Sequence, residues 1–442
     1  MSERPHDTSA VYDGNENLSP DAAPKPYRRG PPAKVLFRGA QIFDGYSGTL
    51  HKGREVLILG DLIHRVSDGP LTVDEETQVI DCGGRVLMPG LIDAHVHVYA
   101  AHIELPTQRP ATYLAHYAAR FLRASLDRGF TTVRDVGGAD FGLAAALRDE
   151  LLVGPRLFYG GRIVTQTGGG NDMRPVDHVL QEPMCGCAGY ADAFTVVADG
   201  RESLLRVVRE ELRRGASHIK IMLSGSVASP HAAVNRSEYS DEEILTIVEE
   251  ARRAGKYVAA HCHTAEAVRR GVTLGVRSIE HGTQIDSETA ELVVKHGAYV
   301  VPTMAIGFAM LEEHESLRLP TVYVEKLRLI WERTLSALQT MKKAGVKMGL
   351  GSDLLGPLYT RQTSELRMRA EISPTLDVLR SACSINAELL GQEGRLGCIR
   401  EGAHADLLVV DGDPLSDIST LTGNGERLCV IMKAGRFHKR TI

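Results

Sequence analysis

Apolar runs alternate with amphipathic stretches through the middle of the chain. The run HIKIMLSG is followed by SDEEILTIVEEARRAG, and the run YVAAHCH is followed by TAEAVRRGVTLG. Short runs rich in Ile, Val and Tyr predict buried strands, and stretches with apolar residues three and four positions apart predict helices. This strand-then-helix repetition predicts an α/β fold, either a (β/α)8 TIM barrel or another parallel arrangement.

The stretch 240–255 carries a complete set of helix signals. Ser240 can cap the helix, and the acidic residues after it suit the first turn. Arg252 and Arg253 suit the last turn, and Gly255 is a typical terminator. The next apolar run begins directly afterwards, so strand and helix alternate with short connections.

Short strand-like runs flank this central region on both sides. VLFRGAQIFDG, EVLILGDLIHRV and TQVIDCGGRVLMPG predict a small antiparallel sheet, and HADLLVVDGDPL and CVIMKAGRFHKR repeat the pattern later in the chain. We expect segments 33–88 and 402–442 to pair into one β-sandwich module beside a barrel formed by residues 89–401. Residues 1–32 are rich in Pro, Asp, Asn and Ser, which predicts a disordered tail.

Composition narrows the setting. With 43% hydrophobic and 24% charged residues, the chain can bury a sizeable core. A net charge of −5 without basic runs argues against nucleic-acid partners, and no apolar stretch is long enough to span a membrane. The first residues lack the apolar segment of a secretory signal, and seven scattered cysteines do not form a disulfide framework. We expect a cytoplasmic protein.

Residues able to bind a metal recur where the apolar runs end. His95 and His97 follow LMPGLIDA, and strand alternation would turn both imidazoles to the same side with Val96 turned away. In a parallel barrel, strand ends of this kind open onto one face, where active sites lie. The residues that share this placement are His95, His97, Lys220, His261, His281 and Asp353.

Each of these residues, taken alone, has a plainer explanation. An HxH pair is a weak motif, and a single strand-end histidine such as His281 is more often a hydrogen-bonded structural residue. Asp353 could cap a helix. Without a metal, a separate explanation is needed for each of these residues, whereas a single metal site explains why all of them lie at strand ends. We therefore favour a metal site.

Lys220 lies between Ile219 and Ile221, which predicts a buried strand, and an unpaired buried lysine is costly. Burial lowers the pKa of a lysine amine. The free amine can take up carbon dioxide, and the resulting carbamate is an oxygen ligand able to bridge two divalent cations. Carboxylation of Lys220 would therefore explain its position.

The chain resembles the amidohydrolase superfamily in PGLIDAHVHV, the strand lysine, two later histidines and the late aspartate. It is most similar to the prolidase-like branch, which includes Xaa-Pro dipeptidases, carboxypeptidases, ochratoxin amidohydrolases and phenylurea hydrolases. FTTVRDVGG, GPRLFYGGRIVTQTGG, RSIEHGTQID and GAHADLLVVDGDPL carry that similarity, which covers residues 34–440. The resemblance implies two divalent metal ions, usually zinc. The implied ligands are His95, His97 and Asp353 for one ion, His261 and His281 for the other, and carboxylated Lys220 as the bridge.

By the same resemblance, a metal-bound hydroxide would attack a C–N bond, and Asp353 would pass its proton to the leaving nitrogen. Asp353 and Lys220 are thus the expected catalytic residues. Relatives commonly form homo-oligomers, and we expect the same here.

Two loops depart from the relatives' pattern. The relatives' TGGHGD motif reads TGGGND here, ending at Asn171 and Asp172, and the segment after the lysine strand reads SPHAAVNR. Arg236 and Tyr239 could still hold a carboxylate, although a solvated arginine is an equal alternative. His263 should face the same side as His261 and line the pocket. Asn171, Arg236, Tyr239 and His263 are the candidate substrate contacts.

We therefore expect a hydrolase that cleaves the amide bond of an N-acyl amino acid, an Xaa-Pro-type dipeptide or a related amide such as ochratoxin. Neutral xenobiotic amides, phenylureas and carbamates are the alternative substrates. Rival hypotheses are a catalytically silent scaffold and a mononuclear deaminase, which would lack the bridging lysine. A metal site at Cys185-Gly186-Cys187 is disfavoured because no second pair completes it.

Overall fold

The computed structural model describes residues 34–103, 109–174, 194–229 and 232–442. The expected tail (1–32) and the Cys185-Gly186-Cys187 motif lie outside these ranges. In the ranges given, no helix is long and apolar enough to cross a membrane.

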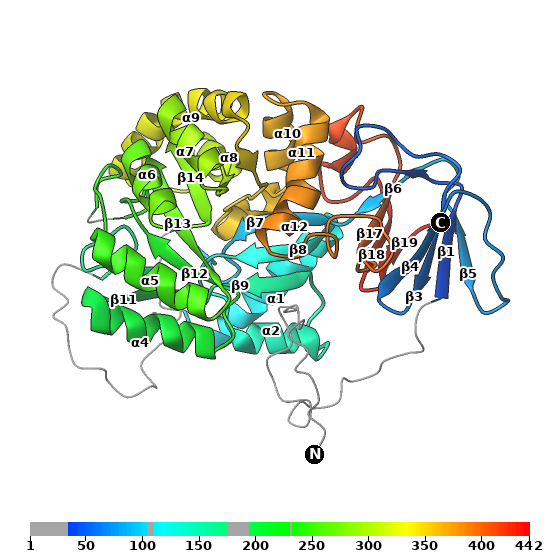
Figure 1. Ribbon diagram of the computed structural model, residues 1–442, viewed down its shortest axis with the longest axis horizontal. Helices are drawn as coiled ribbons and strands as arrows, with labels where there is room; N and C mark the ends of the chain where they lie inside the picture. The colour runs from blue at the N-terminus through cyan, green and yellow to red at the C-terminus, as the bar shows by residue number, and fades with distance from the viewer. Residues whose placement is uncertain (1–33, 104–108, 175–193, 230–231) are drawn as a thin grey trace, which may run out of the picture.

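The central region is an α/β fold with parallel strands, as expected (Figure 1). One parallel sheet has the order β11-β10-β12-β13-β14-β15-β16, and a second has the order β7-β8-β9. The strands are β7 (Leu91–Val96), β8 (Phe130–Asp135), β9 (Arg156–Tyr159), β10 (Ile163–Thr165), β11 (Thr195–Val197), β12 (His218–Met222), β13 (Tyr257–Thr264), β14 (Ser278–Gln284), β15 (Tyr299–Val301) and β16 (Lys347–Met348).

Backbone hydrogen bonds join the edges of the two parallel sheets. The Ala94 N–H in β7 donates to the Leu350 carbonyl just after β16, over 2.8 Å. At the other edge, the Ser217 N–H before β12 donates to the Tyr159 carbonyl at the end of β9, also over 2.8 Å. The two sheets are therefore held together on both sides of β7-β8-β9.

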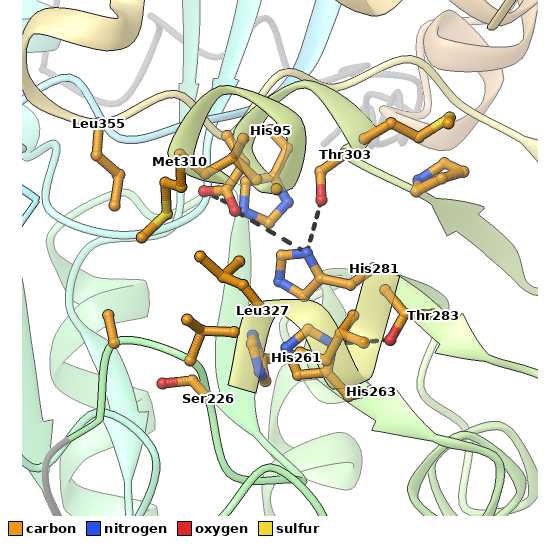
Figure 2. Close-up of a pocket in the computed structure, with 18 of the residues that line it drawn as sticks. His95, Ser226, His261, His263, His281, Thr283, Thr303, Met310, Leu327 and Leu355 are labelled. Atoms are coloured by element: carbon orange, nitrogen blue, oxygen red, sulfur yellow. Dashed lines mark hydrogen bonds and ion pairs between the residues drawn. The ribbon is translucent and has the colours of Figure 1, made fainter. Parts of the chain in front are cut away.

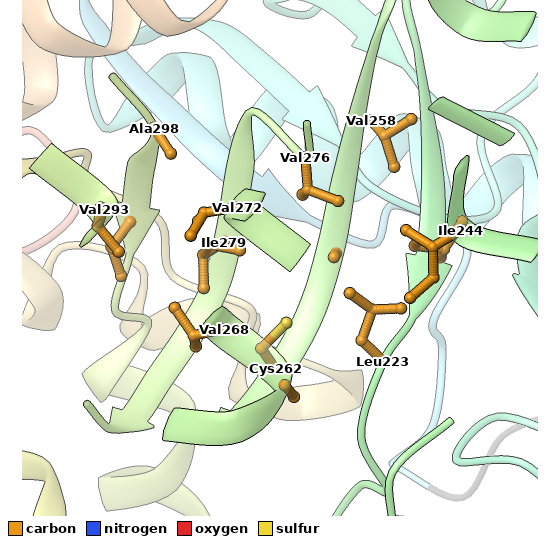
Figure 3. Close-up of a cluster of buried hydrophobic side chains, with 14 of the residues drawn as sticks. Leu223, Ile244, Val258, Cys262, Val268, Val272, Val276, Ile279, Val293 and Ala298 are labelled. Atoms are coloured by element: carbon orange, nitrogen blue, oxygen red, sulfur yellow. The ribbon is translucent and has the colours of Figure 1, made fainter. Parts of the chain in front are cut away.

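Helices pack against the outer side of the strands and bury an aliphatic layer (Figure 3). Leu223, Val258 and Ile279 from the strand region meet Ile244 and Val268 from the helices, all nearly inaccessible to solvent. The α-helices are α1 (Ala111–Asp127), α2 (Phe141–Arg148), α4 (Gly200–Arg213), α5 (Asp241–Arg253), α6 (Ala265–Thr273), α7 (Ser287–Lys295), α8 (Met304–Glu312), α9 (Thr321–Ala344), α10 (Ser364–Ala370), α11 (Thr375–Arg380) and α12 (Asn386–Leu389). Shorter helical turns are η1 (Gly356–Arg361), η2 (Ser381–Ile385) and η3 (Ile418–Leu421).

Helix α5 confirms the signals recognised in the sequence. The Ser240 side chain accepts from the Glu243 N–H, and the Glu243 carboxylate accepts from the Ser240 N–H, which forms a capping box. Arg252 and Arg253 occupy the last turn. Gly255 has a φ of 68°, a conformation that glycine adopts without strain.

The flanking segments form two sheets, with orders β4-β3-β1-β5 and β19-β18-β17-β6-β2. Strand β6 pairs with β17, so segments from both flanks share one sheet, and Phe37, Ile58, Leu407 and Met432 belong to one buried cluster between these strands. The expected all-antiparallel pairing is wrong for β1-β5 and β2-β6, which are parallel. In each pair the chain passes through other strands before it reaches the partner, so the two partners can run in the same direction. The strands are β1 (Lys34–Arg38), β2 (Gln41–Ile42), β3 (Glu55–Leu59), β4 (Leu62–Ser67), β5 (Gln78–Asp81), β6 (Val86–Pro89), β17 (Leu407–Val410), β18 (Leu428–Lys433) and β19 (Arg436–Arg440).

Candidate metal centre and substrate cavity

One cavity beside the parallel strands is lined by all six metal-competent residues singled out in the sequence. Figure 2 labels three of them, His95, His261 and His281. The Nε2 atoms of His95 and His97 each lie 3.3 Å from Asp353 Oδ1. His281 Nδ1 lies 3.9 Å from Asp353 Oδ2. The fold thus brings an imidazole from β7 and one from the residue just after it to a carboxylate more than 250 positions later in the chain.

A hydrogen bond at the opposite ring nitrogen orients each histidine of the HxH pair. His95 Nδ1 lies 2.7 Å from Glu280 Oε2, and His97 Nδ1 lies 2.9 Å from the Gly137 carbonyl. Nε2 of each ring is then the nitrogen that faces Asp353, and it can offer a lone pair to a metal ion when the imidazole is neutral. Metal-binding histidines are commonly oriented in this way by a carboxylate or carbonyl.

The carboxylate behind His95 belongs to a fully buried ion pair. Arg134 Nη2 lies 2.8 Å from Glu280 Oε1, and the Ser278 hydroxyl donates to the same oxygen over 2.6 Å. Burial alone would raise the pKa of Glu280, but Arg134 and His95 hold that pKa well below its usual range. Glu280 is therefore ionised and fixed behind His95.

Lys220 points into the same cavity from β12 and is only 2% exposed. Its amine has no hydrogen-bond or ion-pair partner among the described residues. Burial, with the Arg134 charge nearby, lowers the pKa of Lys220 to about 8, although Glu280 and Asp353 act in the opposite direction. A larger fraction of this amine is therefore uncharged near neutral pH than of an exposed lysine, although the protonated form still predominates at pH 7.

His261 and His281 lie on neighbouring strands, with ring centroids 4.5 Å apart. Burial lowers the pKa of both imidazoles well below the usual value, so both are neutral and able to act as ligands. His281 Nδ1 is 2.7 Å from Thr303 Oγ1, which leaves Nε2 available. His261 Nε2 is 3.3 Å from the Gly225 carbonyl.

Three non-glycine residues, one within β14 and one in each of the segments that follow β15 and β16, have left-handed backbone conformations. The φ values are 75° for His281, 50° for Thr303 and 54° for Asp353. Conformations of this kind cost on the order of 1–3 kcal/mol each and cluster at functional sites. Here they turn two metal-competent side chains, and a hydroxyl that contacts one of them, toward the cavity.

The Asp353 loop is fixed to β7 through Asp93. The Asp93 carboxylate accepts from the Ser352 hydroxyl over 2.6 Å, from the Gln362 amide over 2.9 Å and from the His95 N–H over 3.1 Å. The Asp353 N–H in turn donates to the His95 carbonyl over 2.8 Å. Asp353 is therefore not a helix cap, and its position relative to His95 is set by backbone bonds.

The side chains around Asp353 fit a divalent metal ion. Ligand atoms of His95, His281 and Asp353 all lie within 4.8 Å of one another. Imidazole nitrogens with a carboxylate oxygen are a donor set suited to zinc. Although its carboxylate is buried, the histidine contacts hold the pKa of Asp353 well below its usual range, which favours the anionic form that a metal requires.

The rest of the cavity wall is mainly apolar. It is formed by the segment 302–310 that includes α8, by α9, and by single residues from β10, β12 and the following loops. Among the described lining residues, Lys220 is the only lysine or arginine. The apolar lining residues include Ile163, Met222, Val227, Met304, Ile306, Met310, Leu327, Ile330, Trp331 and Leu355.

The candidate substrate contacts divide into two groups. His263 and Asn171 line the cavity. His263 faces the same side as His261, with Nδ1 3.0 Å from Thr283 Oγ1, while Asn171 donates to Thr195 Oγ1. Arg236 and Tyr239 are not among the lining residues: Arg236 donates to the Gly168 carbonyl and the Tyr239 hydroxyl to the Ala198 carbonyl.

Sequence reasoning missed the residues that hold the ligand side chains in place. Glu280, Arg134 and Asp93 are each fully buried inside strands. Their signal was a charged residue within an otherwise apolar run, as in SIEH, FTTVRD and LMPGLIDA. The same signal drew attention to Lys220.

Comparison with known proteins places this site in a family. The model of the amidohydrolase family matches residues 86–436, which include both parallel sheets and the whole cavity lining. The chain belongs to the amidohydrolase family. Together with the relatives below, this makes it a hydrolase acting on C–N bonds.

Several amidohydrolases are similar over most of their length. Ochratoxinase of Aspergillus niger is 32% identical over 366 residues, covering 80% of this chain and 76% of the relative. The crystal structure of an amidohydrolase superposes with a TM-score of 0.90 at 44% identity, covering 93% of this chain and all of the other. A prolidase complexed with N-methylphosphonate-L-proline gives a TM-score of 0.89 at 40% identity, covering 92% and 100%.

Proposed function

We propose that this amidohydrolase cleaves an amide that joins a bulky apolar acyl group to an amino acid or similar amine. The observation that carries the proposal is the cavity, in which metal-competent side chains face a wall of Met, Ile, Leu and Trp. The similarity to an ochratoxinase and a prolidase supports an amino-acid-like leaving group. N-acyl amino acids, Xaa-Pro-type dipeptides and ochratoxin-like amides are thus the first substrates to test.

A second candidate is a neutral amide, phenylurea or carbamate. The specific observation in its favour is that no arginine lines the described part of the cavity, while Arg236 and Tyr239 bind backbone carbonyls elsewhere. A substrate without a carboxylate requires no cationic clamp.

We propose that the site holds two divalent ions, zinc in the first instance, and that Lys220 is carboxylated. Its uncharged amine would add to carbon dioxide and release one proton, giving a carbamate whose oxygens bridge the ions. His95, His97 and Asp353 would hold one ion, and His261 and His281 the other. When bound, the ions would polarise the amide carbonyl and activate water. Asp353 would accept the proton of that water and deliver it to the leaving nitrogen.

For the architecture, we propose that β7, β8, β9 and β12–β16 close into a (β/α)8 barrel spanning residues 89–401. The backbone bonds at both edges of the smaller parallel sheet support this closure. We propose that segments 33–88 and 402–442 form a β-sandwich beside the barrel, supported by their shared buried cluster. Assembly into a homo-oligomer, inferred from the family resemblance, belongs to the same proposal.

The decisive experiment is a hydrolysis screen with matched substrate pairs in zinc-supplemented buffer. N-acylphenylalanine is compared with N-acylphenylalaninamide, which has the same shape without the carboxylate, and each with a phenylurea and an Xaa-Pro dipeptide. Preference for the acid supports the first candidate, and preference for the amide or urea supports the second. A protein with no stoichiometric divalent metal and no turnover of any substrate would instead be a silent scaffold. One metal with an unmodified Lys220 by mass spectrometry would favour the deaminase hypothesis.

A further inference from the structure

The loop that follows β12 forms part of the cavity wall between two other segments. Ser226, Val227 and Ala228 line the cavity. On one side, the Ser226 hydroxyl donates to the Gly170 carbonyl over 2.7 Å, next to the lining residue Asn171. On the other side, the loop meets helix α9. The position of this loop therefore determines the distance between opposite parts of the wall.

Lys326 of α9 binds the loop at three points. Its ammonium donates to the carbonyls of Ser229 over 2.8 Å, of Ala232 over 2.9 Å and of Ser226 over 3.3 Å. An ammonium has three protons to donate, so these carbonyls account for its full capacity. Within the described residues no carboxylate forms an ion pair with Lys326, and its burial lowers its pKa. The charge is therefore directed at backbone oxygens.

The same face of α9 continues into the cavity wall. The Tyr323 hydroxyl, three positions earlier, donates to the Ala228 carbonyl over 3.0 Å. Leu327 and Ile330, one and four positions later, line the cavity. Helix α9 thus contributes both an apolar surface and polar groups that hold the facing loop against it.

We propose that Lys326 is a positioning residue that sets the width of the substrate cavity by anchoring the loop residues 226–229 and Ala232 to α9. This inference rests on the proposed function, because the loop is taken to contact the substrate. Lys326 lies outside the metal centre, so its loss would weaken binding of the substrate more than it slows the chemical step. A bulky apolar acyl group would be affected more than a small one.

The test compares Lys326→Met with wild type and with Lys342→Met. Lys342 is also in α9, but among the described residues it donates to one carbonyl, that of Ile372, and it does not line the cavity. We expect Lys326→Met to raise KM about tenfold or more for a bulky acyl substrate, with kcat and bound metal changed less than about threefold. Lys342→Met should behave as wild type. Lys326→Arg, which keeps the donors, should restore much of the affinity.

Hydrogen exchange gives a readout that does not depend on turnover. Backbone amides of residues 224–229 and 232–236 should exchange faster in Lys326→Met and stay protected in Lys342→Met. If Lys326→Met does not fold, Tyr323→Phe removes the hydroxyl that donates to the Ala228 carbonyl and should give a smaller change of the same kind. Unchanged exchange and unchanged KM in a folded Lys326→Met would overturn the proposal. Faster exchange in a protein that hydrolyses no amide would reject the proposed function but retain the anchor.

Discussion

Lys220 differs from its neighbours in the cavity because no described side chain forms a hydrogen bond or ion pair with its amine. His95 has Glu280, His97 has a backbone carbonyl and His281 has Thr303 at the nitrogen away from the cavity. A buried amine without a partner is costly, and carboxylation with metal binding would remove that cost. The side chain therefore provides a direct test of the bridging role.

Lys220→Ala should abolish binding of two metal ions and all amide hydrolysis, because the bridge between the ions is lost. Metal content per chain, measured by mass spectrometry of the elements, and turnover report the two effects. Short carboxylic acids should partly restore activity by supplying a replacement carboxylate. Lys295→Ala, an exposed position in α7, is the control. Full activity of Lys220→Ala would remove the bridging assignment.

Asp353→Asn should retain most of the metal but lose turnover by about 10²-fold or more, because the amide cannot accept the proton. Its backbone bond to His95 remains, so the loop should keep its place. Metal content and kcat, measured on the same sample, separate ligand loss from proton-transfer loss. A near-normal kcat would exclude Asp353 from proton transfer.

At this scale the sequence predicted which side chains meet, but not what holds them. His95, His97, Lys220, His261, His281 and Asp353 could be selected because each lies at or near the end of an apolar run. Glu280 and Arg134 carried the same signal as Lys220 but were not selected, because a charged residue in a strand normally faces solvent and only packing shows that both are buried. Arg236 and Tyr239 were selected by residue type alone, and their side chains bind backbone carbonyls outside the cavity.

At the scale of elements, the buried carboxyl group of Glu238 links two segments beside the cavity, the one that contains Gly170 and the one that precedes α5. Its Oε1 accepts from the Gly170 N–H over 2.5 Å, while its Oε2 has no partner among the described residues. Burial raises the pKa of Glu238 to about 7, although the Gly170 N–H and Arg236 lower it. The folded protein therefore retains a proton between about pH 4.5 and pH 7 that the unfolded chain releases.

Glu238→Gln should remove part of this pH dependence. The pKa of Glu238 is higher in the folded protein than in the unfolded chain. The stability that comes from the protonated Glu238 side chain is therefore complete below about pH 4.5 and is lost as the pH rises through about 7. Glutamine keeps the acceptor for Gly170 and carries no charge. We expect the variant to be more stable than wild type at pH 8 by up to about 3 kcal/mol, and similar at pH 4.5. Urea unfolding across this range measures the difference, with exposed Glu291→Gln as the control. Parallel stability profiles for Glu238→Gln and wild type would contradict the assignment.

Helices and strands with strong local sequence signals were predicted well, whereas the direction in which neighbouring strands of the flanking sheets run was not. The capping box of α5 and the strand-helix alternation follow from local residue patterns. The parallel pairing of β1 with β5 depends on the order of the strands within the flanking sheet. Alternation within one strand carries no information about the direction of its neighbour, so this feature could not be predicted.

For the whole molecule, the proposed ions would connect segments that are far apart in the chain, from β7 to the loop after β16. Removing them with a chelator should leave several buried imidazoles and Asp353 without a shared ligand. We expect the unfolding temperature to fall by at least about 5 °C and to recover on adding zinc, because a ligand bound only to the folded state stabilises it. Calorimetry of the two forms measures the shift. An unchanged unfolding temperature, with metal shown to be removed, would contradict a metal held across these segments.

The pairing of β6 with β17 has a consequence for the order of synthesis. More than three hundred residues separate the two strands in the chain. At about 5–20 residues per second, β6 waits at least roughly 15 s for its neighbour to leave the ribosome. During that interval Leu87 and Met88, fully buried in the finished protein, lack the strand that covers them. A chain released before residue 407 would keep this apolar edge exposed, so truncated products should be strong targets for chaperones and proteases.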